Sequence, residues 1–290
     1  MNKKARMDNG EYSIEKSDDE IDFKSSLTNF PILSLTKGSL SEKTKLVAEE
    51  VPIALSYDGT TQAVLMASPD DLEDFAFGFS LTEGLINSVE EIERIGIVNV
   101  PRGIDIQISL NVDRRDAFRK RRRNMAGPVG CGLCGIESID AAMRDIPRVQ
   151  SDMTFSNADV CEAARVICQM QTLNNLTRSA HAAAFYTKEA GVQFVREDVG
   201  RHNALDKLCG HLFRNHINVT DGLIVVTSRL SMEMVQKAAM LGVSSLAAVS
   251  AATAEAIRIG EQSNMTLIGR VRDQDFEIYC GAQRILNATA

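Results

Sequence analysis

The feature that most constrains the fold lies in the last third of the chain. There, short apolar runs alternate regularly with segments that have the residue spacing of a helix. The apolar runs are short and almost free of charge, and the segments between them carry apolar residues at helical spacing. This alternation is typical of a parallel sheet covered by helices on both faces, so it predicts an α/β fold. The predicted strands are 221–228, 244–251, 265–271 and 276–280, and the predicted helices are 231–242 and 253–263.

Hydroxyl groups lie where two of these strands end and the next helices begin. Ser228 and Ser250 end predicted strands, and Ser231 and Thr253 begin predicted helices. The carboxyl ends of parallel strands share one edge of a sheet, so we expect these hydroxyls and the free helix N–H groups to meet there. Such an edge suits phosphate groups. The chain has neither GxGxxG nor GxxxxGK[ST], which excludes the dinucleotide-fold and P-loop fingerprints.

The first half of the chain predicts a smaller α+β part. One helix begins after Ser68-Pro69 with an acidic first turn and ends near Gly84. β-like runs surround this helix in the sequence, and two pairs of them meet at turn signals. The runs are 45–59, 60–68, 94–100 and 104–110, and the turn signals are Asp58-Gly59 and Arg102-Gly103.

These patterns divide the chain into three parts. Residues 1 to about 30 are polar and charged with almost no apolar periodicity, which predicts a mobile tail. Residues 31–126 form the N-terminal α+β part, and residues 127–290 form the α/β part, where we expect a nucleotide to bind. Seven basic residues lie between Arg114 and Arg123 in a chain of net charge −7. This basic segment is either a solvated run or a site that gathers an anionic ligand or an acidic partner.

Composition and charge argue against two classes of protein. The net charge of −7 disfavours a general nucleic-acid binder, because such proteins gain most of their affinity by neutralising phosphates. The N-terminus lacks the apolar core of a signal peptide, and no run approaches the ~20 apolar residues that span a bilayer. We therefore expect a cytoplasmic protein with no nucleic-acid or membrane partner. Thiols stay reduced in that compartment, so a close cysteine pair there is more often catalytic, redox-active or metal-binding than a structural disulfide.

Two cysteines, Cys131 and Cys134, lie in the glycine-rich stretch GPVGCGLCGIE at 127–137. The glycines leave the two sulfurs little steric protection. Apolar residues from Ile136 to Ile146 then repeat at helical spacing, which places the cysteines at or just before a helix N-terminus. Free N–H groups and the helix dipole there lower a thiol pKa from its ordinary value near ~8.5. The sequence therefore predicts a loop that presents reactive thiolates.

A second concentration of charge lies between Arg196 and Lys207, around Gly200. It is either solvated surface charge or a functional junction, where a parallel strand passes into a helix and ligands bind. The remaining cysteines behave as small buried hydrophobes in their apolar surroundings, and we predict that all four belong to the core. They are Cys161, Cys168, Cys209 and Cys280.

Several motifs, taken together, resemble those of a known family. A lone Cys-x-x-Cys is a weak signal, but CGLCG followed at this separation by REDVGRHNALDK is highly specific. The other motifs are VPIALSYDG, LMASPDDLEDFAFGF, HAAAF and TSRLSMEMVQKA. From about Glu50 to Cys280 the chain resembles the FdhD/NarQ family, the formate dehydrogenase accessory sulfurtransferases.

The resemblance implies a function. A member of this family accepts sulfur from a cysteine desulfurase as a persulfide and passes it to the molybdenum cofactor, a bis-molybdopterin guanine dinucleotide, for formate dehydrogenase. Cys131 matches the persulfide cysteine and Cys134 the second cysteine of the motif. The cofactor is a bound substrate, no permanently bound metal is expected, and a homodimer is implied by analogy. From the residues themselves, Cys134 is placed to attack the inner sulfur of a Cys131 persulfide and release the outer sulfur.

The resemblance also implies where the cofactor binds. The family's cofactor segment follows the strand MTLIG, which places it on Arg270, Val271, Arg272, Asp273, Gln274 and Asp275. Arg270 stands where the family pattern has an aromatic residue, and an arginine plane can also stack on a base. Other polar residues suited to phosphates or proton transfer are Ser228, Arg229, Ser231, His181, Arg201 and His202.

The family resembles the cytidine-deaminase α/β fold, a mixed sheet with helices on both faces. Deaminase activity is not expected, because His181-Ala182-Ala183 has alanine where the catalytic glutamate of His-x-Glu would stand. Two rival classes remain open. One is a structural zinc site that uses Cys131 and Cys134 with His181 or His202, although such sites usually have two close ligand pairs. The other is a thiol-disulfide oxidoreductase, which would leave most of the chain unexplained.

Overall fold

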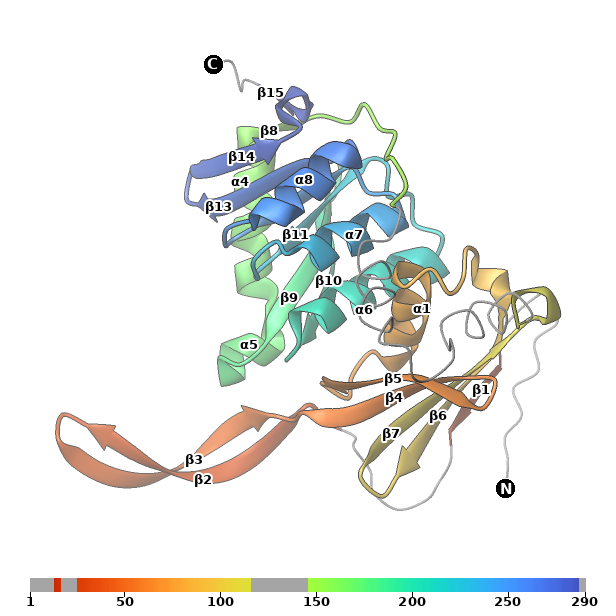
Figure 1. Ribbon diagram of the computed structural model, residues 1–290. Helices are drawn as coiled ribbons and strands as arrows, with labels where there is room; N and C mark the ends of the chain where they lie inside the picture. The colour runs from red at the N-terminus through yellow and green to blue at the C-terminus, as the bar shows by residue number, and fades with distance from the viewer. Residues whose placement is uncertain (1–12, 17–24, 116–145, 287–290) are drawn as a thin grey trace, which may run out of the picture.

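The computed structural model describes residues 13–16, 25–115 and 146–286 (Figure 1). These residues form layers. A six-stranded sheet carries helices on both faces, and helix α1 (Leu72–Thr82) lies between those helices and a separate five-stranded sheet. The α/β class predicted from the sequence is therefore confirmed.

The six-stranded sheet contains the alternating elements of the last third of the chain. Its strand order is β10-β9-β11-β12-β13-β14. The central strands pair in parallel, and the outer strands run antiparallel to their neighbours. The predicted parallel arrangement is confirmed in the centre, and the sheet as a whole is mixed. The strands are β9 (His181–Thr187), β10 (Gly191–Asp198), β11 (Gly222–Val226), β12 (Ser245–Ala248), β13 (Thr266–Arg272) and β14 (Asp275–Cys280).

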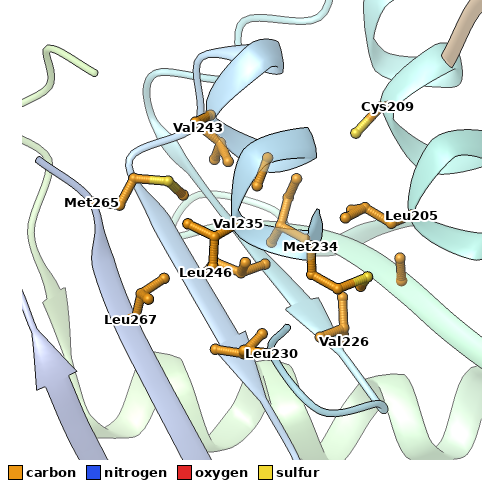
Figure 2. Packing of buried hydrophobic residues seen from close by; sticks show 14 of the residues in the cluster. Leu205, Cys209, Val226, Leu230, Met234, Val235, Val243, Leu246, Met265 and Leu267 are labelled. Atoms are coloured by element: carbon orange, nitrogen blue, oxygen red, sulfur yellow. The ribbon is translucent and has the colours of Figure 1, made fainter. Parts of the chain in front are cut away.

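Helices cover both faces of this sheet, as predicted. On one face, α6 (Arg201–Arg214), α7 (Met232–Leu241) and α8 (Ala254–Gln262) enclose a core of Leu, Val and Met side chains (Figure 2). On the other face, α4 (Asn157–Met170) packs over a second core and is followed by α5 (Thr172–Thr177). Short elements complete this half: β8 (Phe155–Ser156), β15 (Ile285–Leu286) and a 3-10 turn at Ala282–Arg284.

The five-stranded sheet forms most of the N-terminal part. Its order is β1-β6-β7-β4-β5, and a third core fills the space between it and α1. Asp58 and Gly59 have φ values of 47° and 78°, which fit the two-residue hairpin turn predicted there. The elements are β1 (Ser13–Lys16), β4 (Val51–Tyr57), β5 (Thr60–Ala67), β6 (Ile92–Val100), β7 (Gly103–Leu110) and a 3-10 turn at Val89–Glu91.

A two-stranded hairpin extends away from the rest of the described chain (Figure 1). Its strands, β2 (Leu27–Thr36) and β3 (Ser39–Ala48), pair along their full length, and we call residues 27–48 the arm. The stretch predicted as a tail thus contains β1 and the start of β2. Backbone pairing forms these strands without the apolar periodicity that the prediction required. The predicted strand 45–59 is also corrected, since its first residues belong to β3.

Helix α1 crosses α6 at a contact between backbones. A Cβ atom added to Gly78 would lie 1.7 Å from the carbonyl oxygen of Asp206, and one added to Gly210 would lie 1.8 Å from that of Asp74. Only glycine fits at these two positions, because any side chain would collide with the facing main chain. The two glycines therefore set how closely the N-terminal part approaches the six-stranded sheet.

Candidate functional site

Polar residues gather where the parallel strands end and three helices begin, at one edge of the six-stranded sheet. The loops after β11 and β12 are joined there, because Leu230 N donates to Ala251 O at 3.1 Å and Thr253 N donates to Leu230 O at 2.9 Å. Thr227 Oγ1 accepts from Ala182 N at 2.9 Å and connects β9 to the same loops. We call this region the polar edge. It comprises His181, Arg201, His202, residues 228–231, residues 250–253 and Arg270.

The two hydroxyl groups that begin α7 and α8 differ in what they bind. Thr253 Oγ1 accepts from Ala256 N and caps its own helix. Ser231 is the N-cap of α7, but its Oγ makes no cap bond and is a buried atom without a partner among the described residues. Beside it, Ser228 is buried and Arg229 is exposed. The start of α7 therefore offers a hydroxyl and free N–H groups to a ligand.

The start of α6 contributes positive charge and two imidazole rings. Arg201 is the first residue of this helix, and its Nε is buried without a partner in the described chain. Burial and then the nearby Arg201 lower the pKa of His181 and that of His202. His202 Nε2 lies 2.8 Å from Glu233 Oε2. Both imidazoles are thus mainly neutral near pH 7, and the guanidinium supplies the charge that would attract an anion.

The predicted cofactor segment, Arg270 to Asp275, comprises the end of β13, the turn at Asp273-Gln274 and the first residue of β14, and it reaches the same edge. Arg270 N donates to Ser250 O at 3.0 Å, which joins the segment to the loop before α8. The Arg270 side chain is exposed and lies 3.3 Å from Glu277. Val271 is buried beneath α4, whereas Arg272, Asp273, Gln274 and Asp275 are exposed.

Most of the charged side chains between Arg196 and Lys207 are held inside the protein. Arg196 Nε donates to Asp74 of α1 at 2.7 Å. Lys207 lies 2.7 Å from Asp198, and neither of these side chains is exposed. Three more members of the segment have partners within the protein: Glu197 at the start of α5, Asn203 at the carbonyl of Met66, and Asp206 at Thr82. The contacts of Arg196, Asn203 and Asp206 hold the N-terminal part against the six-stranded sheet.

Arg201 and His202 are the members of this segment that lie at the polar edge. The junction before them differs from the prediction, because β10 is not a parallel strand. It pairs antiparallel with β9 through a hairpin. The junction still reaches the polar edge, since Asp198, at the end of β10, pairs with His181.

A pocket of about 300 Å³ lies beside the polar edge, between α1, α6 and α7. Its floor holds a charge network that sequence reasoning missed. Lys237 Nζ lies 3.0 Å from Asp206 and 2.9 Å from Glu83. Burial opposes the charge of Lys237, but the two carboxylates raise its pKa, so it stays positive. The sequence signal for this network was Lys237, a lysine beside Met234 and Ala238 on an otherwise apolar helix face.

Cys131, Cys134 and the predicted helix after them lie outside the described residues. Of the other cysteines, Cys209 is buried as predicted. The prediction is wrong for Cys168, which lies in the last turn of α4, is exposed, and is not among the residues that pack against the core below this helix. Cys161 and Cys280 are half-buried and contact the core. Burial raises the pKa of all four thiols, so none of them is a favourable thiolate.

Two arginines of the basic segment are described, and both bind main-chain carbonyls. Arg114 donates to Gly84 O and Leu85 O, and Arg115 donates to Leu110 O. Within residues 13–16, 25–115 and 146–286, no three His, Cys, Asp or Glu side chains are grouped closely enough to hold a metal ion. Within the same ranges, none of the helices has the length and apolar character needed to cross a membrane.

Fold and site together define an α/β protein in which hydroxyl groups, arginine side chains and the free N–H groups of helix starts lie at one edge of the main sheet. The model of the FdhD/NarQ family matches residues 48–286. The chain therefore belongs to the FdhD/NarQ family.

Individual relatives agree with this assignment. The chain is 50% identical over 254 residues to the sulfur carrier protein FdhD of Agrobacterium fabrum, a match that covers 87% of this chain and 94% of that protein. It is 51% identical over 248 residues to the protein of the same name from Brucella abortus, covering 85% and 92%. A crystal structure from Desulfotalea psychrophila, assigned as a formate dehydrogenase accessory protein, is 22% identical. It has a TM-score of 0.71 and covers 90% of this chain and 100% of that one, so it supports the fold.

Proposed function

We propose that this protein is a sulfur carrier that matures formate dehydrogenase. The observation that carries the proposal is the match to the FdhD/NarQ family from residue 48 to residue 286, a range that includes Cys131 and Cys134. Relatives at about half identity bear the name sulfur carrier protein FdhD. The raised pKa values of the four described thiols also favour Cys131 and Cys134 as the reactive pair.

In the proposed reaction, the Cys131 thiolate attacks the outer sulfur of a persulfide on a cysteine desulfurase. An S–S bond forms on Cys131, and the thiolate of the desulfurase cysteine leaves. The Cys134 thiolate then attacks the inner sulfur of the Cys131 persulfide. A Cys131–Cys134 disulfide forms, and the outer sulfur departs as hydrosulfide to the molybdenum atom of the substrate. A cellular dithiol must reduce the disulfide before the next cycle.

The substrate is the molybdenum cofactor with two guanine nucleotides, and we place its nucleotide phosphates at the polar edge. Arg201, Ser231 and the N–H groups that begin α7 are the donors best placed for them. Arg229 and Arg270 are exposed beside these donors and supply charge or a stacking plane for a base. The neutral imidazoles of His181 and His202 can accept a proton at this edge.

Other parts of the proposal follow from family membership. A cysteine desulfurase is the donor, formate dehydrogenase is the client, two copies of the chain form a homodimer, and the protein works in the cytoplasm. We also propose that the six-stranded sheet is related to the cytidine-deaminase fold.

The experiment compares wild type, Cys131→Ala and Cys134→Ala after incubation with a desulfurase and cysteine. Mass spectrometry should find one added sulfur atom on Cys131 in the wild type and none in Cys131→Ala. Cys131→Ala should bind guanosine diphosphate normally yet yield inactive formate dehydrogenase. Active client enzyme from Cys131→Ala would overturn the carrier role, and stoichiometric zinc bound to the wild type would favour a zinc site instead.

Arg201→Gln tests the placement of the nucleotide. It should weaken the binding of guanosine diphosphate by at least about tenfold, since a charge-assisted contact to phosphate contributes ~1.5–3 kcal/mol. Arg258→Gln is the matched control, because Arg258 is exposed on α8 and pairs with Glu255. If Arg201→Gln and Arg258→Gln bound guanosine diphosphate with equal affinity, the phosphates would bind elsewhere.

A further inference from the structure

The arm presents an apolar face that no described part of the chain covers. Leu33, Leu35 and Leu40 are 69%, 68% and 70% exposed. Alternate residues of a strand point to the same side, and Leu35 pairs directly with Leu40, so the three leucines share one face. Pro31 and the half-buried Leu46 lie on the same face, and we call these five apolar residues the leucine face. Glu42 also lies on this side, opposite Leu33.

A hairpin of this kind requires a packing partner. Two strands alone are at best marginally stable in water, and a hydrophobic face on a hairpin needs a third strand or another surface. Among the described strands, β2 and β3 pair only with each other. The arm also points away from the described body of its own chain, which leaves the leucine face open to another molecule (Figure 1).

Charge favours a second copy of this chain as that molecule. The arm carries Lys37, Lys43 and Lys45 against a single acidic residue, Glu42, which gives it a charge of +2. The whole chain has a charge of −7, so the remainder carries −9. Lys43 and Lys45 lie on the side of the arm opposite the leucine face. The net charges therefore attract the arm to another copy over a distance, while Lys43 and Lys45 remain on the outward side of the docked arm.

The same chain also offers an apolar surface that could receive the leucine face. Val64 and Met66 of β5 are 61% and 47% exposed. They pair with Ala54 and Pro52 of β4, so these four residues form one patch on the outer face of the five-stranded sheet. Strand β5 ends this sheet among the described strands, and it contains no charged residue. Edge strands normally carry charge or proline to prevent pairing, so this edge is unprotected.

We propose that the arm of one copy docks on a second copy of this chain, with its leucine face over the Pro52, Ala54, Val64 and Met66 patch. The patch lies at the root of the arm, because β4 starts at Val51 and the arm ends at Ala48. A two-fold axis then lets each copy receive the partner's arm beside the root of its own. The arm has two ten-residue strands and a two-residue turn, and its alternate residues on the leucine side supply part of the roughly 20–30 residues that each partner contributes to a stable interface.

This inference gives the proposed homodimer its contact surface, and it stands whether or not the protein carries sulfur. Sedimentation velocity of wild type and of the triple variant Leu33→Ser, Leu35→Ser, Leu40→Ser tests it. Wild type should sediment as a dimer at micromolar concentration, and the triple variant should dissociate at least ~100-fold more readily because the buried leucines are lost. Val112→Ser is the control, since Val112 is 65% exposed and lies outside the arm.

The triple variant should keep the helical circular dichroism signal of wild type, because its leucines make no contact within one chain, and its melting temperature should fall by no more than the stabilisation that dimerisation supplies. A monomeric wild type throughout the micromolar range overturns the proposal. So does a triple variant that dimerises as tightly as wild type.

A second experiment tests the docking surface directly. A photo-crosslinking amino acid replaces Leu40 in unlabelled protein, which is mixed with ¹⁵N-labelled chain. After illumination, crosslinked peptides should join unlabelled arm to labelled peptides from residues 51–67. Crosslinks that join the arm only to its own chain, or to another region of the labelled copy, overturn the proposed surface.

Discussion

Lys207 and Asp198 form an ion pair in which Nζ and Oδ2 lie 2.7 Å apart and neither side chain is exposed. Lys207 also donates to Ser68 O at 2.9 Å, and Asp198 accepts from Ser68 N at 3.0 Å. Ser68 lies just before α1, so the pair holds the N-terminal part against the six-stranded sheet. Asp198 also accepts from Gly200 N at 2.7 Å and fixes the start of α6. The polar edge thus depends on a buried contact between distant parts of the chain.

Lys207→Met is expected to lower the free energy of unfolding by about 3–5 kcal/mol, because it leaves the Asp198 carboxylate buried without its cation. Urea denaturation measures the change. Arg165→Met is the control, since it breaks an ion pair with Glu162 that is also short, at 2.6 Å, but exposed to water. The control should show no measurable change. If Lys207→Met were equally harmless, the pair would not support the fold.

The contact between α1 and α6 gives a second prediction. Gly78→Ala should lower the free energy of unfolding by about 1–3 kcal/mol or more, because the added methyl group would meet the main chain at Asp206 and force the helices apart. Gly96→Ala is the matched control, since the nearest atom to its added Cβ would be 3.7 Å away. Chemical denaturation of both variants checks the prediction, which fails if the two differ by less than the experimental error.

The elements of the fold that sequence could predict are those whose apolar pattern is local. The run 221–228 contains β11 and the run 231–242 contains α7, because each has its own continuous or helical apolar spacing. The arm gave no such signal. Its strands leave most of their side chains exposed, and its turn at Lys37-Gly38 is not among the common hairpin dipeptides.

The sequence predicted residues that form the polar edge, but it did not predict the buried contacts that hold this edge in place. The rule that parallel strand ends share an edge placed Ser231 and Thr253 together, and the structure brings both there. The family resemblance supplied Arg270, which reaches the same edge. The structural role of Asp198 and Lys207 was missed because their partner Ser68 lies 139 residues from Lys207. Contacts between such distant positions leave no periodic pattern in one sequence.

The titration of His181 gives a third prediction. Burial, and then Arg201, lower its pKa from the ordinary value of 6.5. By NMR its ring should titrate below 6.5, and Arg201→Gln should raise the midpoint. The folded state binds fewer protons at this histidine than the unfolded chain. Its contribution to stability is therefore present above pH 6.5 and declines as the pH falls from 6.5 through the folded pKa. An unchanged midpoint in Arg201→Gln would contradict the assigned cause.

The difference between Cys168 and Cys209 gives the last prediction. Cys168 is exposed and Cys209 is fully buried, although burial of the sulfur raises the pKa of both thiols. Iodoacetamide should therefore alkylate Cys168 slowly in the folded protein and Cys209 only after unfolding, as peptide mass spectrometry can measure. If iodoacetamide alkylated Cys209 in the folded protein as fast as Cys168, the buried position of Cys209 would be contradicted.

This accessibility matters for the sulfur-carrier proposal, because an exposed Cys168 can also collect sulfur from a donor. Cys168→Ser removes that alternative without disturbing a core position. The variant should still gain one sulfur atom on Cys131 and still mature formate dehydrogenase. If the added sulfur disappears in Cys168→Ser, then Cys168 is the acceptor, and the carrier role assigned to Cys131 is wrong.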